Sequence, residues 1–277
     1  HVLVGVTDIG TGAKTTMAII AAEALGIPLN QIQLTNGDTD VTPYSVGESG
    51  SRTTPFTGPA VIAAAEDVRR QIFNVAAPQL KAKPEDLDLK EGNVFVKSNP
   101  SQSLPLGRAV SRSGELIGRA TTNPTFKGVE GKSFAAHFAE VEVDSWTGHV
   151  KITRYVAAHD SGTIINRLAA ESQIKGGVVQ GIGMALTEEL LIDRPTAIPL
   201  NPSYRDAKIP THLETPEVEV LFIEHSDPYG PFGGKVVGEP PITPAVATIA
   251  NAIFNATGKR FKELPITPDK ILNAVRV

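Results

Sequence analysis

Four glycine-rich segments contain most of the residues that could bind a ligand or do chemistry, and they are residues 10–12, 47–58, 176–183 and 230–238. Three of them lie at or just before predicted helix starts, where unpaired N–H groups and the positive end of the helix dipole favour oxyanions. Glycine also lets the backbone approach a ligand closely. Taken singly, such a turn is more often a plain connection, and neither the GxGxxG pattern nor the GxxxxGK[ST] pattern of nucleotide-binding folds is present.

The second segment is the richest in side-chain donors. Five donors fall within six positions, namely Ser49, Ser51, Arg52, Thr53 and Thr54. Hydroxyl groups beside one arginine suit an anionic ligand, and the alternative is a solvated loop. The residues alone favour neither a site for an anionic ligand nor a solvated loop. Nearby Tyr44 and Glu48 could line the mouth of a pocket or be ordinary surface residues.

Two polar side chains stand out in glycine-rich surroundings. Gln180 lies among small and apolar residues, where it either hydrogen-bonds within the core or faces a ligand. Glu239 follows Gly238 and precedes two prolines, so a stiff backbone holds its carboxylate. Burial would raise its pKa and suit it to act as a base near neutral pH. The residues alone favour the alternative, a carboxylate that interacts with the dipole of the following helix.

Hydrophobic periodicity predicts the elements that position these residues. Strands are predicted at residues 2–7, 31–36, 137–143, 150–157 and 217–223, with a hairpin at 87–89 and 93–97. Helices are predicted after Gly12, from Pro59 to Pro78, over 169–191, and before Gly258. Residues 98–132 are predicted to be an irregular connection between two subdomains, 1–132 and 133–277. Because strands and helices interleave without strict alternation, we predict an α+β fold of mixed sheets packed with helices.

Composition argues against several classes of function. The chain has 277 residues, of which 41% are hydrophobic and 20% charged, as in ordinary globular proteins. A net charge of −4 without a long basic block argues against nucleic-acid binding, and no apolar run approaches the ~18 residues of a membrane span. Without cysteine the chain cannot ligate an iron–sulfur cluster through thiolates, and its six histidines form no HxxxH or HExxH pair that would bind zinc.

The segments occur in an order that resembles the molybdenum-binding subunit of the xanthine dehydrogenase/aldehyde oxidase family. The resemblance spans nearly the whole chain, and the GEPP segment with the lysine before it is its most specific part. The matching segments are residues 7–12 (TDIGTG), 22–28 (AEALGIP), 50–54 (GSRTT), 139–144 (AEVEVD), 160–162 (DSG), 180–183 (QGIG), 230–241 (GPFGGKVVGEPP) and 249–253 (IANAI).

The resemblance implies the fold of the molybdenum-cofactor-binding domain of molybdenum hydroxylases. It implies a molybdenum–pterin cofactor, often a cytosine dinucleotide in bacterial members. It also implies hydroxylation of an aldehyde, or of a ring carbon of an aromatic N-heterocycle, with oxygen from water. Glu239 matches the family's general base, and Gln180 matches a residue that contacts the ligand sphere of the metal.

Other matches concern the cofactor. The residues that match the loop binding the pterin and its phosphates are Gly50, Ser51, Arg52, Thr53 and Thr54. A second cofactor-binding turn is matched by Gly10, Thr11 and Gly12, and Gly238 is assigned to the cofactor as well. Many family members have glutamine at the position of Thr11, and the shorter threonine could lose a contact to the cofactor. We interpret this threonine as a subgroup feature.

Only the second half of the family's molybdenum region is matched, and the chain begins with His1 at a predicted strand. We therefore expect either one subunit of an enzyme divided over several genes or a cloned piece, inactive by itself. Expected partners are the remaining half of the molybdenum region, an iron–sulfur subunit, an FAD subunit and a small-molecule substrate, in the cytoplasm or alternatively the periplasm. The competing hypotheses are a non-catalytic assembly half and an unrelated module that binds phosphorylated ligands without molybdenum.

Overall fold

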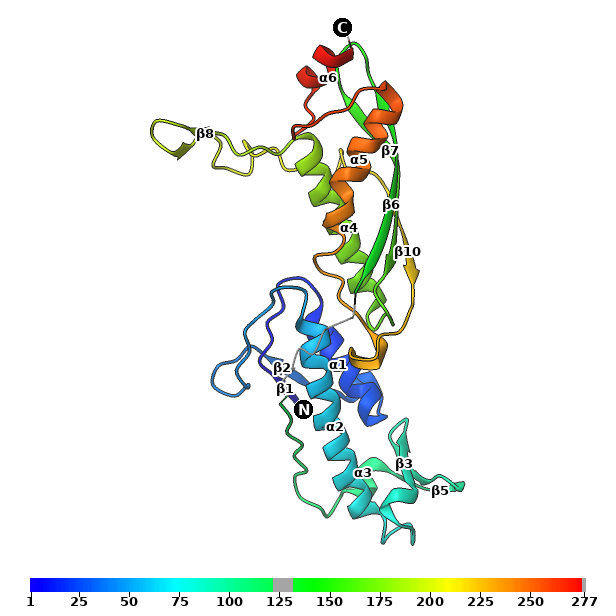
Figure 1. Cartoon of the computed structure of the whole chain (residues 1–277). Coiled ribbons are helices and arrows are strands. Elements are labelled where there is room, and N and C mark those ends of the chain that lie inside the picture. The colour runs from blue at the N-terminus through cyan, green and yellow to red at the C-terminus, as the bar shows by residue number, and fades with distance from the viewer. Residues whose placement is uncertain (122–131, 276–277) are drawn as a thin grey trace. The chain divides into compact units, whose positions relative to one another are not determined.

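The computed structural model describes residues 1–121 and 132–275 (Figure 1). The chain divides into two compact units. Unit 1 consists of residues 1–131 together with 226–235, and unit 2 of residues 132–225 and 236–277. A short segment late in the sequence therefore completes the packing of the first unit. The assignment of residues 1–132 and 133–277 to two cofactor-binding subdomains stays a prediction.

Unit 1 begins with a parallel pair of short strands joined through a helix, in which Val2 lies opposite Leu34. The helix ends at Gly26, whose φ of 77° suits glycine and whose Cα lies so close to the Leu89 carbonyl that a Cβ would clash. This helix packs against a second, longer one. The elements are β1 (Val2–Val4), α1 (Ala13–Leu25), the 3-10 turn Leu29–Gln31, β2 (Leu34–Asn36) and α2 (Thr53–Ala76).

The start of α2 corrects a prediction. We expected Pro59 in the first turn of this helix, but α2 begins at Thr53, and the Phe56 N–H already donates to the Arg52 carbonyl at 2.9 Å. Proline removes one helical hydrogen bond, so packing must stabilise the preceding turn. Gly58 is buried, and a Cβ there would lie 2.5 Å from the Pro231 side chain. That contact comes from residues far along the chain, which no local pattern reveals.

A three-stranded antiparallel sheet in the order β3-β4-β5 follows α2. The predicted hairpin around Glu91 and Gly92 is confirmed, since Leu89 pairs with Val94. The prediction of an irregular connection is wrong for its first part, because residues 99–109 form an edge strand and a helical turn. Two prolines and four polar residues in this exposed strand obscured the strand pattern in the sequence. The elements are β3 (Leu87–Lys90), β4 (Asn93–Val96), β5 (Asn99–Pro105) and α3 (Leu106–Ala109).

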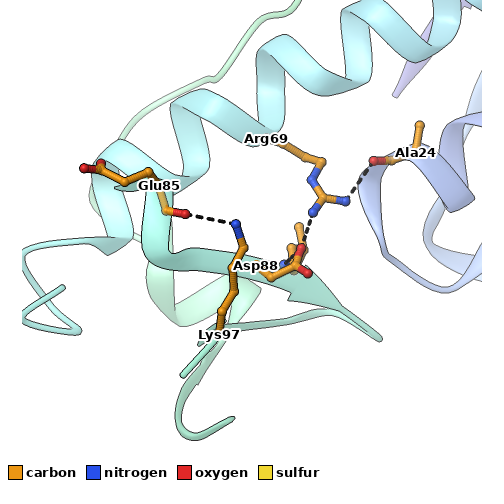
Figure 2. Close-up of polar contacts among 6 residues, drawn as sticks. Ala24, Arg69, Glu85, Asp88 and Lys97 are labelled. Atoms are coloured by element: carbon orange, nitrogen blue, oxygen red, sulfur yellow. Dashed lines mark hydrogen bonds and ion pairs between the residues drawn. The ribbon is translucent and has the colours of Figure 1, made fainter. Parts of the chain in front are cut away.

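Polar contacts of Arg69 connect the parts of unit 1 (Figure 2). Its guanidinium donates to the Ala24 carbonyl at the end of α1, at 3.1 Å, and pairs with Asp88 on β3. Lys97 Nζ donates to the Glu85 carbonyl at 2.9 Å and holds the turn before β3. A single arginine on α2 thus fixes both α1 and the sheet against the helix that begins at the donor-rich loop.

Unit 2 is a three-stranded sheet in the order β10-β7-β6, with α4 and α5 packed together on one of its faces (Figure 1). β6 and β7 are antiparallel, β10 is parallel to β7, and the predicted turn between β6 and β7 is confirmed. The elements are β6 (Phe134–Val143), β7 (Val150–Asp160), α4 (Arg167–Leu186), β8 (Ile192–Asp193), β9 (Ile198–Pro199), β10 (Val218–Ile223), α5 (Ile242–Thr257) and α6 (Pro268–Val275). The mixed sheets covered by helices confirm the predicted α+β fold.

Two features of unit 2 differ from the predictions. α4 ends at Leu186 rather than continuing to residue 191, because the chain leaves it for the small β8–β9 hairpin. α6 was not predicted, since its amphipathic stretch is short and Ile271 is its one fully buried residue among those that the structure describes. Over the part of the chain that the structure describes, no helix is long and apolar enough to cross a membrane.

Candidate functional site

The glycine-rich turn before α1 is capped by its own carboxylate. Asp8 Oδ1 accepts the N–H groups of Gly10 and Gly12 at 3.0 and 3.1 Å, and Oδ2 accepts that of Lys14 at 3.1 Å. Although burial opposes the shift, backbone N–H donors from residues 10–12 and 14 lower the pKa of Asp8. The positive end of α1 therefore already faces a negative charge from this chain.

Thr11 connects this turn to the donor-rich loop. Its hydroxyl donates to the Glu48 carboxylate, whose two oxygens lie 2.9 and 2.8 Å from Thr11 Oγ1. Both residues are partly buried, whereas nearby Tyr44 is 90% exposed. The structure thus links the predicted turn at residues 10–12 to Glu48, two residues before the predicted loop at 50–54. Sequence reasoning missed both the capping role of Asp8 and this link.

The loop before α2 has a different backbone. Gly50 and Ser51 have φ values of +63° and +54°, and Arg52, the N-cap residue, returns to the right-handed region. A left-handed conformation is rare for serine, and such residues cluster at binding sites. Alternation between left- and right-handed residues points successive N–H groups toward one side, which is the geometry of an anion-binding nest.

Arg52 is the residue most suited to hold an anion. Its Nε is buried, and among the described residues it has no hydrogen-bond partner. α2 has no acidic residue in its first turn and no side-chain cap, and no partner is recorded in the described chain for the N–H groups of Thr53 and Thr54. A buried donor without an acceptor is costly, so an acceptor from outside the chain is expected here.

In unit 2, Gln180 and Glu239 lie on neighbouring segments. α4 approaches the start of α5 so closely that a Cβ at Gly177 would lie 2.6 Å from Pro241 Cβ, and one at Gly181 only 2.3 Å from Ala245 Cβ. Gln180 lies beside this glycine contact, on α4, and its side chain is exposed rather than part of the core. The two glycines therefore allow the helix that carries Gln180 to approach the turn that carries Glu239.

The turn before α5 is short and stiff. The Ile242 N–H donates to the Glu239 carbonyl, and the Thr243 N–H to the Pro240 carbonyl, both at 3.3 Å. Upstream, Ser133 Oγ donates to the Val236 carbonyl at 2.7 Å, which ties the turn to the start of β6. Glu239 itself is exposed in this chain, as is Gly238. Its carboxylate is thus accessible to a ligand that binds this face of unit 2.

Comparison with known proteins assigns the chain. Residues 1–216 match the family model described as the molybdopterin cofactor-binding domain. The chain belongs to that family. It is 35% identical over 280 residues to the xanthine dehydrogenase molybdenum-binding subunit of Escherichia coli O157:H7, covering 96% of this chain and 36% of that subunit. The aldehyde oxidoreductase molybdenum-binding subunit PaoC of Escherichia coli (strain K12) is 36% identical over 270 residues, with the same coverage.

The fold of this molybdopterin cofactor-binding domain agrees with that assignment. It resembles the crystal structure of quinoline 2-oxidoreductase from Pseudomonas putida 86 with a TM-score of 0.88 and 29% identity, over 98% of this chain and 36% of that one. The resemblance to molybdenum-binding subunits that the sequence motifs indicate is therefore confirmed. The domain spans only about 36% of the length of the relatives it matches.

The donors in the loop before α2 fit a molybdenum–pterin cofactor. Such a group carries phosphate oxygens, which accept hydrogen bonds from guanidinium and backbone N–H donors. The buried, unpartnered Arg52 Nε and the open start of α2 offer such donors. By contrast, the α1 turn offers a carboxylate at the equivalent place. The roles of Gly10, Thr11 and Gly12 as cofactor ligands stay predictions.

Proposed function

We propose that this domain supplies part of the cofactor site and the general base of a molybdenum hydroxylase. The loop of residues 50–54 and the start of α2 would bind the phosphate-bearing end of the molybdenum–pterin cofactor. Gln180 and Gly238 are proposed as further cofactor contacts. The observation that supports this proposal best is the buried Arg52 Nε, which has no acceptor among the described residues. We further propose the cytosine dinucleotide form of the pterin.

The overall reaction replaces a C–H bond by a C–OH bond. Substrate and water yield the hydroxylated product, two protons and two electrons. When bound, the molybdenum–pterin cofactor supplies the redox chemistry, and the electrons pass to iron–sulfur clusters and FAD that we place on partner chains. The exposed carboxylate of Glu239 takes the proton from the water-derived oxygen as that oxygen forms its bond to carbon. The substrate class is an aldehyde or an aromatic N-heterocycle.

Exposed apolar side chains support a heteromeric assembly. In the segment after α4, Leu213 is 94% exposed and Leu190 67%. The face of the β10-β7-β6 sheet opposite the helices exposes Phe134, Phe138 and Ile223. Large exposed apolar areas mark interaction sites, and relatives are much longer than this chain. We therefore propose that the remaining part of the molybdenum region covers these surfaces, and that the chain alone is inactive. A cytoplasmic location stays a prediction.

The test is Glu239→Gln in the assembled enzyme. We expect kcat to fall by roughly 10²–10⁴-fold while the molybdenum content stays unchanged, because glutamine keeps the size of the side chain but cannot accept the proton. Glu263→Gln, an exposed carboxylate elsewhere in unit 2, is the matched control and should be silent. Full activity of Glu239→Gln would favour the non-catalytic assembly half. Binding of simple phosphorylated ligands without molybdenum would favour the phosphate-binding module.

A further inference from the structure

A chain of polar side chains is buried in unit 2, between the sheet and its two helices. His137 Nδ1 lies 2.9 Å from the Tyr155 hydroxyl, and His137 Nε2 lies 2.7 Å from His159 Nε2. Tyr155 and His159 are fully buried, and His137 is 9% exposed. Nothing in the proposed reaction uses these groups, although buried polar networks are costly unless every member is satisfied.

The hydrogens in this chain all point in one direction along it. Burial lowers the pKa of His137 and His159 to about 4, so both rings are neutral near pH 7 and each has one N–H. The contact between His137 and Tyr155 and the contact between His137 and His159 therefore hold one hydrogen each. In either direction of the chain, His159 Nδ1 is left without a partner among the described residues.

His159 Nδ1 is the open end of the chain. It is buried and has no partner among the described residues, and the same holds for Ser161 Oγ, in a residue that is 2% exposed. Ser161 directly follows β7, which ends at Asp160, and comes two residues after His159. A ring nitrogen and a hydroxyl, each without a partner among the described residues, are therefore buried two residues apart in the sequence.

The open end adjoins the turn that carries Glu239. Ser133, at the start of β6, bonds to Val236, and the Thr248 hydroxyl lies 3.4 Å from the His137 carbonyl. Residues 236–248 therefore run alongside residues 133–137 of β6. His159 pairs with Ala135, midway along that stretch. Because the His159 side chain contacts His137 on the helix-covered face, it lies next to the path from Val236 to the first turn of α5, and Ser161 follows two residues later.

We infer that His159 Nδ1 and Ser161 Oγ form an internal site for one water molecule, and that this water positions the Glu239 turn. The water hydrogen-bonds to His159 Nδ1 and to the Ser161 hydroxyl, which satisfies both groups. A hydrogen of the water is left for a backbone carbonyl. Pro240 and Pro241 lack N–H groups, so this part of the turn offers only carbonyl acceptors. His159 is thus a positioning residue, and this role rests on the proposed function of Glu239.

The experiment combines a crystal structure of the assembled enzyme with kinetics of variants. The structure should show an ordered water within hydrogen-bonding distance of His159 Nδ1 and Ser161 Oγ. Ser161→Ala should lower kcat roughly tenfold, as loss of groups that orient functional residues does, with KM, molybdenum content and unfolding temperature unchanged. Ser145→Ala, an exposed serine in the β6–β7 turn, is the matched control.

Two substitutions of His159 separate its nitrogens. Asparagine places a polar atom near the position of Nδ1, whereas glutamine places one near that of Nε2. We expect His159→Asn to keep more of kcat than His159→Gln, because the water contact matters to the turn and the His137 contact does not. The reverse order would overturn the inference, as would wild-type kcat in Ser161→Ala or a structure without water at this position.

Failure of this inference is distinguishable from failure of the proposed function. If Glu239→Gln abolishes turnover and Ser161→Ala does not change it, the water site has no positioning role and the general base stands. If Glu239→Gln keeps full activity, the proposed function is wrong, and a positioning role for His159 falls with it.

Discussion

The turns before α1 and α2 use similar residues in opposite ways. Both are rich in glycine, both contain left-handed residues, and both lead directly into a helix. At α1, Asp8 accepts three backbone N–H groups and occupies the positive end of the helix. At α2, no acidic residue caps the helix, and a buried arginine nitrogen has no acceptor among the described residues.

The difference teaches that a glycine-rich turn before a helix is not by itself an anion site. What matters is whether the chain supplies its own negative charge. Asp8 already satisfies N–H groups of the α1 turn from within the chain, so we expect this turn to contribute to stability and to hold Glu48 through Thr11. The α2 turn is completed by a ligand, in our proposal the cofactor. Substitutions in the α1 turn should therefore change the stability of the protein, whereas substitutions in the α2 turn should change its cofactor content.

Among substitutions in the two turns, Arg52→Ala should have the largest effect, which is a loss of cofactor binding. Loss of a charge-assisted hydrogen bond costs about 1.5–3 kcal/mol, which weakens binding roughly 10- to 150-fold. We expect the molybdenum content of the purified assembled enzyme to fall accordingly, with little change in unfolding temperature of the cofactor-free protein. Arg52→Lys should recover part of the content, because lysine keeps the charge but not the planar fork. Full molybdenum content in Arg52→Ala would remove the contrast between the turns.

Asp8→Ala should change stability and leave cofactor content intact. Removing a side chain that caps the start of a helix costs about 0.5–2 kcal/mol. The measurement is urea unfolding of the variant beside the wild type, together with molybdenum analysis. If Asp8→Ala instead loses molybdenum at unchanged stability, the α1 turn binds the cofactor and the comparison fails.

The pH dependence of stability tests whether Asp8 stabilises the folded protein as a carboxylate. Its folded pKa lies below the ordinary value of 3.8, so its contribution to stability is fully present above pH 3.8 and is lost as the pH falls through the lowered value. The stability difference between wild type and Asp8→Asn should therefore be constant at neutral pH and shrink in this acidic range. Unfolding temperatures of both proteins between pH 7 and pH 3 test this, and a difference that grows with acidity would contradict it.

Among these substitutions, Thr11→Val should have the smallest effect on stability. The substitution removes the hydrogen bond to Glu48 while keeping the side-chain shape, at a cost of about 1 kcal/mol or less because the contact is only partly buried. Thr11→Ser, which keeps the hydroxyl, is the control and should match the wild type. A loss of molybdenum in Thr11→Val, with Thr11→Ser normal, would show that the hydroxyl serves the cofactor and not the loop.

The sequence predicted most of the secondary structure but only part of the site. The strands of unit 2 and the cluster of donors at residues 49–54 follow from local patterns, and the motif order led to the family. The start of α2 at Thr53 could not be predicted, because it depends on Pro231 packing against Gly58. The burial of Arg52 Nε depends on packing in the same way. The contact of Asp8 was predictable in principle, since an aspartate two residues before a glycine commonly accepts the N–H group of that residue in a turn.

Residues 226–235 belong to unit 1, although unit 2 supplies residues on both sides of them in the sequence. During synthesis, residues 1–131 therefore leave the ribosome long before the segment that closes their packing. Pro231 must reach Gly58 across 173 positions of chain, and such a distant contact is slow to form. The α2 start, with its buried arginine, is consequently among the last parts of unit 1 to mature, and a nascent chain stopped before residue 231 would lack it.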